Sequence, residues 1–311
     1  MSQTVLVTGC FGFIGSNLVE SLLKKKYHVI GIGNPRKEKQ HNFVSFIDNS
    51  SFELLETDIM RINPTQRVEH EIDTVFHLAT NRNNATPIVL TEINVTGTVN
   101  ILEFVRQNDI KKIVFSSSAA VYGVSSESPI TEKTKTNPQN VYAASKLSAE
   151  KYIQVYHRQY GIKTAILRLF NVYGPKQAKN HGAVSIFINQ AMKDESITLE
   201  GNGSYEYTPI YVSDLLDAII LASKKSTIRE EIINIGGPEI VTIGHIAQRV
   251  IQLVKRSKSK IKFKKPRPNW GTSHIGSIET MKEILDFVPR WSLDEGLNET
   301  ITWYEQFYPE K

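Results

Sequence analysis

The chain has 311 residues, of which 40% are hydrophobic and 22% charged, a composition typical of a water-soluble globular protein. No uninterrupted apolar run in it approaches the ~18 residues that span a membrane, and we expect no signal peptide because the first residues lack a charged segment and a cleavage site. Its single cysteine, Cys10, excludes an internal disulfide and a multi-cysteine metal site. We therefore expect a cytoplasmic protein with no membrane partner and no metal.

The chain carries a formal net charge of +5 and has a sequence pI of about 9.0. Much of the excess positive charge lies in residues 255–267, KRSKSKIKFKKPR. A basic run of this kind can bind nucleic acid. No nucleic-acid-binding motif accompanies it, so a solvated surface segment is favoured and we expect no nucleic-acid partner. A third alternative is that one of its basic residues binds a substrate phosphate.

The first half of the chain alternates apolar strands with helical patterns. Continuous apolar strands in this arrangement indicate a parallel sheet with helices on both faces, a doubly wound α/β fold. Strands are expected at 4–9, 27–33, 51–59, 74–79, 111–118 and 163–174, and helices at 15–26, 92–109 and 142–161.

The regular alternation of predicted strands and helices ends after residue 174, where the predicted elements become shorter and more varied. We expect a first domain over 1–174, with returns near 209–238, and a smaller α/β lobe formed mainly by 175–311. Helices are expected at 185–193, 212–225, 242–256, 277–287 and 293–307, and strands at 196–201 and 231–237.

A glycine-rich loop joins the first strand to the first helix. Gly9, Gly12 and Gly15 have the spacing G-x-x-G-x-x-G. Glycines permit a tight turn and a close approach of the backbone, and the following helix N-terminus offers N–H groups to a pyrophosphate. The strand before the loop and the helix after it make a dinucleotide site the favoured interpretation. Cys10, inside the loop, is expected to serve as a small residue rather than a reactive thiol.

The end of the second strand leaves the choice between NAD and NADP open. An acidic residue at this point would bind the adenine ribose of NAD, but the chain has Gly33 there, followed by Arg36 and Lys37. Glycine leaves room for a 2′-phosphate, which the basic pair could neutralise. Alternatively, Asn34 contacts the ribose and the basic pair is solvated. Asp58, after the third strand, could bind the adenine amino group or simply cap a helix.

Tyr142 and Lys146 are four residues apart on a predicted helix and therefore share one face. An ammonium group beside a phenol stabilises the phenolate and lowers its pKa. Such a phenolate, near a serine hydroxyl, can take a proton from an alcohol while hydride leaves the same carbon. Ser118, at the end of the fifth predicted strand, supplies that hydroxyl.

Taken together, these motifs resemble the extended short-chain dehydrogenases/reductases, and within them the nucleotide-sugar epimerase/dehydratase group. The motifs run in the family's order along nearly the whole chain. They are TGCFGFIG (8–15), HLA (77–79), NVTGT (94–98), SSSAAVYG (116–123), YAASK (142–146), LRLFNVYGP (167–175) and YVSDLLDA (211–218).

The resemblance implies a Rossmann domain for NAD or NADP, a C-terminal lobe for a nucleoside-diphosphate sugar, and a homodimer built on the helices around 92–108 and 142–160. Ser118 would be the catalytic serine, Tyr142 the base and Lys146 the ribose-binding lysine. The implied cofactor-binding residues are Gly9, Phe11, Gly12, Phe13, Ile14, Gly15, Asn34, Arg36, Asp58, Ile59, Leu78, Ala79, Arg82, Asn94, Tyr142, Lys146, Phe170 and Val172. The implied substrate-binding residues are Ser118, Asn171, Val184, Thr198, Glu200, Tyr207, Arg267 and His274.

Two departures from the family pattern, Gly33 and Tyr207, bear on the cofactor and the substrate, and a further comparison with the sugar dehydratases bears on the reaction. Tyr207 stands where the family usually has an arginine, and Thr208 where it has an aspartate, so one diphosphate ligand is missing. Ala119 and Ala120 stand where the sugar dehydratases carry an Asp-Glu pair, so elimination of water lacks its acid and base.

Without an acid and a base for elimination, the reactions that these residues can still perform are hydride and proton transfer at one carbon. The favoured hypothesis is a nucleoside-diphosphate-sugar 4-epimerase. The alternative is an NADPH-dependent 4-keto-sugar-nucleotide reductase, which the missing acid at Gly33 favours. A third hypothesis, of another class, is a catalytically silent cofactor-binding or scaffold protein. Ser118, Tyr142 and Lys146 argue against it, whereas Tyr207 argues for it.

Overall fold

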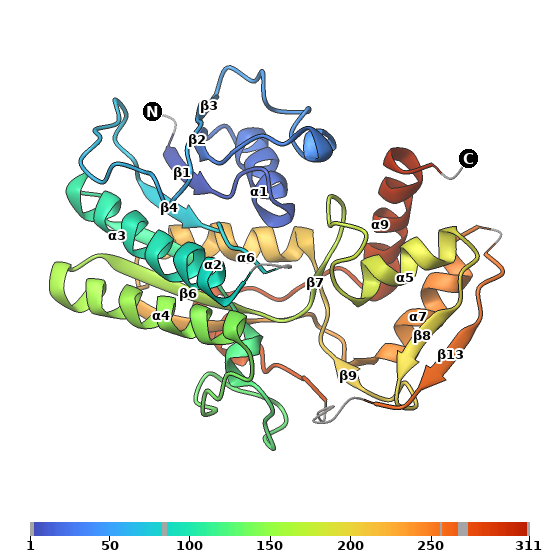
Figure 1. The fold of residues 1–311 in the computed structure, drawn as a ribbon. Coiled ribbons are helices and arrows are strands. Elements are labelled where there is room, and N and C mark those ends of the chain that lie inside the picture. The colour runs from blue at the N-terminus through green and yellow to red at the C-terminus, as the bar shows by residue number, and fades with distance from the viewer. Residues whose placement is uncertain (1–2, 83–85, 256, 267–272, 310–311) are drawn as a thin grey trace. The chain divides into compact units, whose positions relative to one another are not determined.

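The computed structural model describes residues 3–82, 86–255, 257–266 and 273–309, with the backbone but not the side chains of 37–39. The chain forms two compact units (Figure 1). Unit 1 consists of 1–123, 136–168 and 216–233, and unit 2 of 124–135, 169–215 and 234–311.

Unit 1 is built on a seven-stranded sheet with the order β11-β6-β5-β4-β1-β2-β3. The pairs β1–β2, β2–β3, β1–β4 and β4–β5 are parallel. The chain order reverses between β1 and β4, and ligands of doubly wound sheets bind beside such a reversal at the carboxyl ends of the strands. The strands are β1 (Thr4–Thr8), β2 (His28–Ile32), β3 (Phe52–Leu55), β4 (Thr74–His77), β5 (Lys112–Ser118), β6 (Lys163–Leu169) and β11 (Glu230–Ile235).

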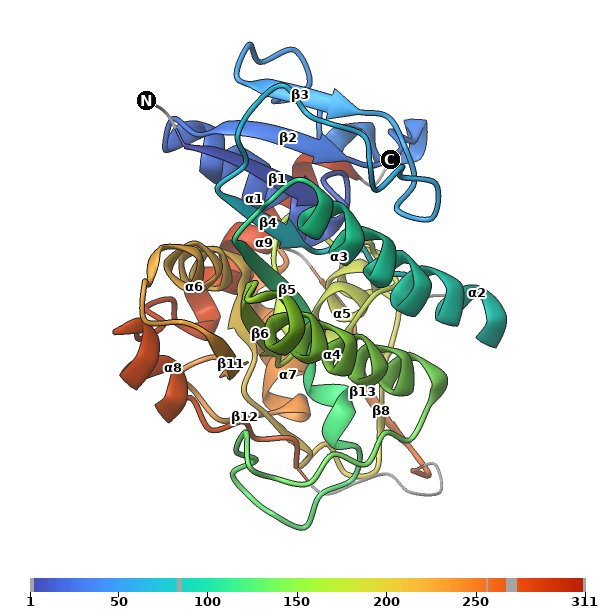
Figure 2. The same cartoon turned by 90° about the vertical axis from the view of Figure 1, so that its left-hand side faces the viewer.

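Helices cover both faces of this sheet, which confirms the predicted α/β class. Figure 2 shows α1 and α6 on one side and α3 and α4 on the other. The continuous apolar strands of the sequence are buried because both faces are covered. The helical segments are α1 (Phe13–Lys24), η1 (Lys37–Asn42), α2 (Pro87–Thr91), η2 (Glu92–Thr96), α3 (Gly97–Gln107), η3 (Ala119–Tyr122), α4 (Val141–Tyr160) and α6 (Val212–Lys224).

The helix expected at 92–109 begins earlier, at Pro87, where the Thr86 hydroxyl caps it by accepting from the Val89 N–H. Segments α2, η2 and α3 then run continuously over 21 residues that are long and apolar enough to cross a membrane. Ile101, Leu102 and Phe104 of this stretch lie in the core of unit 1. The core helix of a protein outside the membrane meets the same length and hydropathy criteria.

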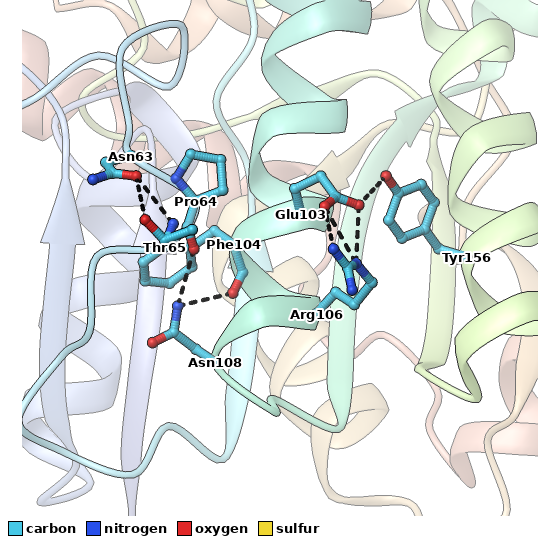
Figure 3. Close-up of polar contacts among 8 residues, drawn as sticks. All are labelled: Asn63, Pro64, Thr65, Glu103, Phe104, Arg106, Asn108 and Tyr156. Atoms are coloured by element: carbon cyan, nitrogen blue, oxygen red, sulfur yellow. Dashed lines mark hydrogen bonds and ion pairs between the residues drawn. The ribbon is translucent and has the colours of Figure 1, made fainter.

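Polar contacts fix α3 against its surroundings (Figure 3). Glu103 accepts hydrogen bonds from Arg106 on the same helix (2.7 Å) and from the Tyr156 hydroxyl of α4 (2.6 Å). At the C-terminus of α3, the Asn108 amide donates to the Phe104 carbonyl (3.0 Å) and to the preceding loop at Pro64 (3.5 Å). These bonds link α3 to α4 and to the loop between β3 and β4.

The strand expected at 163–174 is interrupted. β6 ends at Leu169, Asn171 has a left-handed φ of 42°, and β7 (Val172–Tyr173) pairs instead with β10 (Ile210–Tyr211). The continuous apolar pattern did not reveal this break. Asparagine is among the residues that tolerate a left-handed conformation, so the chain can turn at Asn171 without a glycine or a proline to signal it.

Within its described residues, unit 2 contains short two-stranded sheets and the helices α5, α7, α8 and α9. The basic segment predicted to be a solvated surface run contains an exposed edge strand, β13, which pairs in parallel with β8. The antiparallel pair β9–β12 was also missed by sequence reasoning, since each strand has only two residues. The elements are α5 (Ala183–Met192), β8 (Ile197–Glu200), β9 (Glu206–Tyr207), β12 (Val241–Thr242), α7 (Ile243–Leu253), β13 (Ile261–Lys264), α8 (Glu279–Leu285) and α9 (Leu293–Phe307).

Candidate active site

The glycine loop between β1 and α1 forms a tight cradle at the carboxyl end of β1. Gly9 has φ +71°, and a Cβ added there would lie 2.9 Å from the backbone of Ala79, after β4. A Cβ on Gly15 would lie 2.1 Å from the Gly9 carbonyl oxygen. Both positions therefore require glycine, and the loop packs directly against the segment that follows β4.

The helix that follows this loop is suited to hold a pyrophosphate. Gly12 is its N-cap and makes no side-chain cap. The Ser16 N–H is bonded to the Gly12 carbonyl, so the N–H groups of Phe13 and Ile14 precede the intrahelical ladder. Free N–H groups and the positive end of the helix dipole favour an anion at this position. The residues present thus fit a dinucleotide cofactor.

Cys10 in the same loop is a packing residue. Its side chain is fully buried, and burial raises the pKa of the thiol to about 12. A thiol with so high a pKa is not a nucleophile at neutral pH.

Gly33, after β2, faces this loop. A Cβ at Gly33 would lie 3.2 Å from the Cys10 sulfur and 3.3 Å from the Phe11 ring. Close packing is therefore one physical reason for glycine here, independent of the cofactor's ribose. Asn34 and Arg36 are exposed, and the side chain of Lys37 lies outside the described residues.

Asp58 and Ile59 follow β3. The Asp58 carboxylate accepts a hydrogen bond from the Met60 N–H (2.9 Å), so it stabilises a local turn. Ile59 is buried, and a Cβ on Gly97 of α3 would lie 2.6 Å from its side chain. The adenine-binding role of Asp58 stays a prediction.

A buried chain of hydrogen bonds starts at the end of β4 and fixes the tautomer of His77. The Thr8 hydroxyl accepts from the N–H groups of Leu78 (3.2 Å) and Ala79 (3.1 Å). Its own proton is therefore directed to His77 Nδ1 (2.8 Å). His77 Nε2 then donates to the Thr98 hydroxyl (3.0 Å), which itself donates to the carbonyl of residue 94. Burial, with a smaller effect from the positive charge of the lysine at 146, lowers the pKa of His77 to about 3, so the ring is neutral.

Asn94 fixes the loop after β4. Its Oδ1 accepts from the Thr80 hydroxyl (3.0 Å) and the Asn81 N–H (2.9 Å). Its Nδ2 donates to the Asn81 carbonyl (3.0 Å) and to the Ser145 hydroxyl (3.0 Å). The amide is buried and all four of its hydrogen-bonding positions are used. In this structure Asn94 therefore serves to hold the loop that carries Thr80 and Arg82.

Ser118 and Tyr142 are brought together in unit 1. Ser118 ends β5 and accepts a hydrogen bond from the Ala120 N–H (3.2 Å), which leaves its own O–H free to donate. Tyr142 is in the first turn of α4, where the Asn140 side chain caps the helix. The hydroxyl groups of Ser118 and Thr80 lie close enough to the Tyr142 hydroxyl to favour its phenolate form.

A cation and two hydroxyl groups surround the Tyr142 phenol. Desolvation raises the pKa of Tyr142, and the positive charge of Arg82 and the neighbouring hydroxyl groups of Ser118 and Thr80 lower it. The Arg82 guanidinium carbon lies 5.3 Å from the centre of the Tyr142 ring. Arg82 therefore supplies a cation beside Tyr142 in this structure, and the stabilisation of the phenolate by Lys146 stays a prediction.

Lys146 is instead directed into the protein. Its ammonium lies 4.1 Å from the centre of the Phe115 ring. Burial lowers the pKa of Lys146 to about 7, and the negative charge of Glu150, one turn further along α4, opposes that shift. Glu150 is fully buried and accepts two hydrogen bonds from Arg168 of β6 (3.0 and 2.7 Å) and one from Ser117.

Apart from Ser118, the described residues predicted to bind the sugar nucleotide lie in unit 2, as do Phe170 and Val172, which were predicted to bind the cofactor. Phe170 is fully buried, and its ring lies 5.3 Å from that of His274. Tyr207, on β9, forms a β-bridge with His274. Glu200 is buried and paired with Lys264 (3.1 Å). Arg267 lies outside the described residues. Asn171 and Thr198 are exposed, Val172 is half-buried and Val184 is buried.

Sequence reasoning missed Thr80, His77 and Glu150. Glu150 could have been found, because it continues the i, i+4 spacing of Tyr142 and Lys146 on one helix face. His77 and Thr80 could not, because their roles depend on contacts between β1, β4 and the helix that carries Asn94.

Comparisons with known proteins agree with this geometry. Residues 5–236 match the sequence model of the NAD dependent epimerase/dehydratase family. A crystal structure of UDP-glucuronic acid 4-epimerase from Bacillus cereus, in complex with UDP-glucuronic acid and NAD, is similar with a TM-score of 0.90 and 30% identity over 98% of this chain and all of that one.

Two further proteins illustrate the range of reactions among the relatives. UDP-glucose 4-epimerase from Thermotoga maritima, with UDP-glucose, has a TM-score of 0.88 and 30% identity over 98% of this chain and 99% of that one. UDP-glucuronic acid decarboxylase 6 from Arabidopsis thaliana is 33% identical over 95% of this chain and 87% of its own length. With a Rossmann sheet, a glycine cradle and the Ser118–Tyr142 pair in place, the chain belongs to the NAD dependent epimerase/dehydratase family.

Proposed function

We propose that the protein is a nucleoside-diphosphate-sugar 4-epimerase that works by reversible hydride transfer at C4 with bound NAD. The observation that carries this proposal is the pairing of Ser118 with Tyr142 beside alanines at 119 and 120. The pair can serve an alcohol–ketone interconversion at one carbon. The alanines offer no group to protonate a leaving hydroxyl at C6 or to remove the C5 proton.

In this mechanism, Ser118 donates a hydrogen bond to the C4 oxygen, since its own oxygen already accepts from the Ala120 N–H. Tyr142, as phenolate, takes the C4 hydroxyl proton. Bound NAD would supply reversible hydride transfer at C4, and return of the hydride to the opposite face of the 4-keto sugar would invert this carbon. Tyr142 then gives back its proton, so the reaction has no net redox change. Arg82 stabilises the phenolate form of Tyr142.

Unit 1 is proposed to hold the cofactor. The glycine cradle and the N-terminus of α1 would take the pyrophosphate. Lys146 would bind the nicotinamide ribose, and Asp58 and Ile59 would lie at the adenine. Asn94 would act indirectly, because its amide is fully bonded within the loop after β4.

The nucleoside diphosphate sugar is proposed to bind residues of unit 2. UDP sugars are the substrate class of the similar solved structures, and we extend that class to this chain. Asn171, Tyr207, Arg267 and His274 stay the predicted ligands, with Arg267 as the diphosphate-binding cation. Arginine suits this role because its planar guanidinium matches phosphate oxygens.

A homodimer built on α3 and α4 is proposed as the assembly, in the cytoplasm and with no nucleic-acid or membrane partner. Exposed apolar side chains on this side of unit 1 support it: Ile88 is 69% exposed, Tyr152 44% and Val155 41%. Light scattering of the wild type and of Tyr152→Glu tests the assembly, since a charge at a dimer interface should yield monomers.

The function is tested by incubating the purified protein, without added cofactor, with UDP-glucose, UDP-glucuronic acid and UDP-N-acetylglucosamine, and following products by NMR. A C4 epimer without net NADH supports the proposal. Formation of a 4-keto-6-deoxy sugar, or of a pentose with release of carbon dioxide, contradicts it.

A 4-keto-sugar-nucleotide reductase is the second candidate, favoured by the lack of an acid at Gly33. The tight packing of Gly33 against Cys10 and Phe11 weakens that argument. Reduction of a dTDP-4-keto-6-deoxy sugar with consumption of NADPH, and no C4 epimer from any UDP sugar, would favour the reductase.

A further inference from the structure

We propose that His28, Glu53 and His70 form a binding site for a divalent transition metal of the Zn²⁺ class. The site lies in unit 1, away from the glycine cradle and the Ser118–Tyr142 pair. The sequence alone gave no sign of it, because the three residues are separated along the chain and match no metal-binding spacing.

The sheet places His28 and Glu53 on one face. His28 begins β2, and Glu53 of β3 lies opposite Ile30 in the parallel register. Side chains two residues apart on a strand point to the same face, so His28, Ile30 and Glu53 share it. His70 comes from the long connection between β3 and β4, and its ring centre lies 4.6 Å from that of His28.

The ligand atoms converge on one point. His28 Nε2 lies 3.8 Å from Glu53 Oε2, and His70 Nε2 lies 3.9 Å from the same oxygen. One ligand atom from each of the three side chains falls within 4.8 Å of the other two. Zn²⁺ binds imidazole nitrogen and carboxylate oxygen at about 2.0–2.2 Å, so ligand atoms of a tetrahedral site are about 3.4 Å apart. Small rotations of the side chains bring the group to that spacing.

A second observation points to a ligand at this place. His28 Nε2 is buried and makes no hydrogen bond within the described part of the chain. A buried polar atom without a partner is costly, and the nearest carboxylate oxygen lies at 3.8 Å, beyond hydrogen-bond distance. A cation between the two would satisfy both. The side chains of Glu53 and His70 are 45% and 47% exposed, which leaves a path for an ion to enter.

The ligand chemistry selects the kind of metal. Two imidazoles and one carboxylate suit Zn²⁺ and neighbouring transition metals, whereas Mg²⁺ and Ca²⁺ prefer oxygen ligands alone. Three protein ligands leave one tetrahedral position for water.

The location indicates a structural or regulatory role rather than a part in catalysis. His28 is at the amino end of β2, whereas the cofactor cradle lies at the carboxyl ends of the strands, about 13 Å away along a strand of this length. A bound ion would cross-link β2 and β3 to the connection 56–73, which carries Asp58 and Ile59 at its other end. Metal binding should therefore slow local opening of this connection.

The test uses the full chain and Zn²⁺ or Co²⁺ alone as the probe. Zn²⁺ affinity is measured by competition with a chromophoric chelator for the wild type and for His28→Gln, Glu53→Gln and His70→Gln. His245→Gln is the matched control, because His245 is an exposed histidine of α7 outside the cluster. Hydrogen exchange of peptides covering 56–73 is followed with and without Zn²⁺, and Co²⁺ absorption reports tetrahedral geometry.

The proposal predicts one Zn²⁺ per chain, a loss of affinity of at least about tenfold in each of the three variants, and no loss in the control. It also predicts slower exchange over 56–73 with Zn²⁺, and no displacement by millimolar Mg²⁺. Glu53→Gln and His70→Gln should keep C4 epimerase activity, which checks that they fold. Wild-type protein that does not bind Zn²⁺ at micromolar concentrations, or binding that none of the three substitutions weakens, would overturn the proposal.

Discussion

The substitution Glu150→Gln would remove one charge of a buried ion pair that links α4 to β6. Glu150 and Arg168 are 0% and 3% exposed as side chains, with the closest contact at 2.7 Å. The guanidinium also lies 4.8 Å from the centre of the Tyr122 ring, and its second terminal nitrogen is buried without a hydrogen bond in the described structure. The substitution would therefore leave a buried cation uncompensated.

Removing one partner of a buried pair typically costs about 3–5 kcal/mol. Glutamine keeps the shape of the side chain and one acceptor oxygen, so we expect a loss of about 3 kcal/mol in the free energy of unfolding. With an m-value of about 3 kcal/mol/M, the urea midpoint should fall by about 1 M. The loss of the carboxylate that raises the pKa of Lys146 should also lower that pKa further.

A matched control lies on the same helix. Arg158 of α4 pairs with Glu230 of β11 at 2.8 Å, but with side-chain exposures of 64% and 25%. Solvated pairs contribute little, so Glu230→Gln should change the free energy of unfolding by no more than about 0.5 kcal/mol. Urea denaturation followed by fluorescence compares the two variants. Equal losses would refute the reasoning, because burial would then not decide the strength of the pair.

Three further substitutions test the site. Tyr142→Phe should lower kcat by about 100-fold or more while NAD affinity, measured by calorimetry, stays within a few fold, since the phenol moves a proton; full activity would contradict its role as base. Gly15→Ala should weaken NAD binding by at least about tenfold, because a Cβ would lie 2.1 Å from the Gly9 carbonyl oxygen. Gly161→Ala, with nothing within 4 Å of its Cβ but a left-handed φ of +70°, should lower stability and leave NAD affinity unchanged. Arg82→Gln should move the increase of kcat with pH to higher pH, because Arg82 lowers the pKa of Tyr142 and its loss delays formation of the phenolate. Arg82→Lys should restore the wild-type dependence of kcat on pH. An unshifted dependence in the Gln variant would contradict the role of Arg82 at Tyr142.

Much of the fold follows from local sequence patterns. The alternation of buried strands and helices predicts the doubly wound sheet, and the spacing of Gly9, Gly12 and Gly15 predicts the cradle, because these features depend on neighbours in the chain. The helix that carries Tyr142 and Lys146 was predicted for the same reason. The direction taken by the Lys146 side chain was not, because it depends on a ring from β5.

Features that depend on contacts between distant segments escaped prediction. The break after Leu169 arises from a left-handed Asn171 and the pairing of β7 with β10. The role of Arg82 at Tyr142 depends on how Asn94 fixes the loop after β4. The His28–Glu53–His70 cluster depends on strand register, which no single-sequence pattern reveals.

The central claim is that the enzyme inverts C4 with a hydride that never leaves the active site. NMR of UDP-glucose deuterated at C4, incubated with the purified protein in ordinary water without added NADH, tests it directly. We expect a C4 epimer that retains deuterium at C4, formed at a rate that Tyr142→Phe reduces by about 100-fold or more. Loss of the label to solvent, or conversion that needs stoichiometric NADPH, would contradict it.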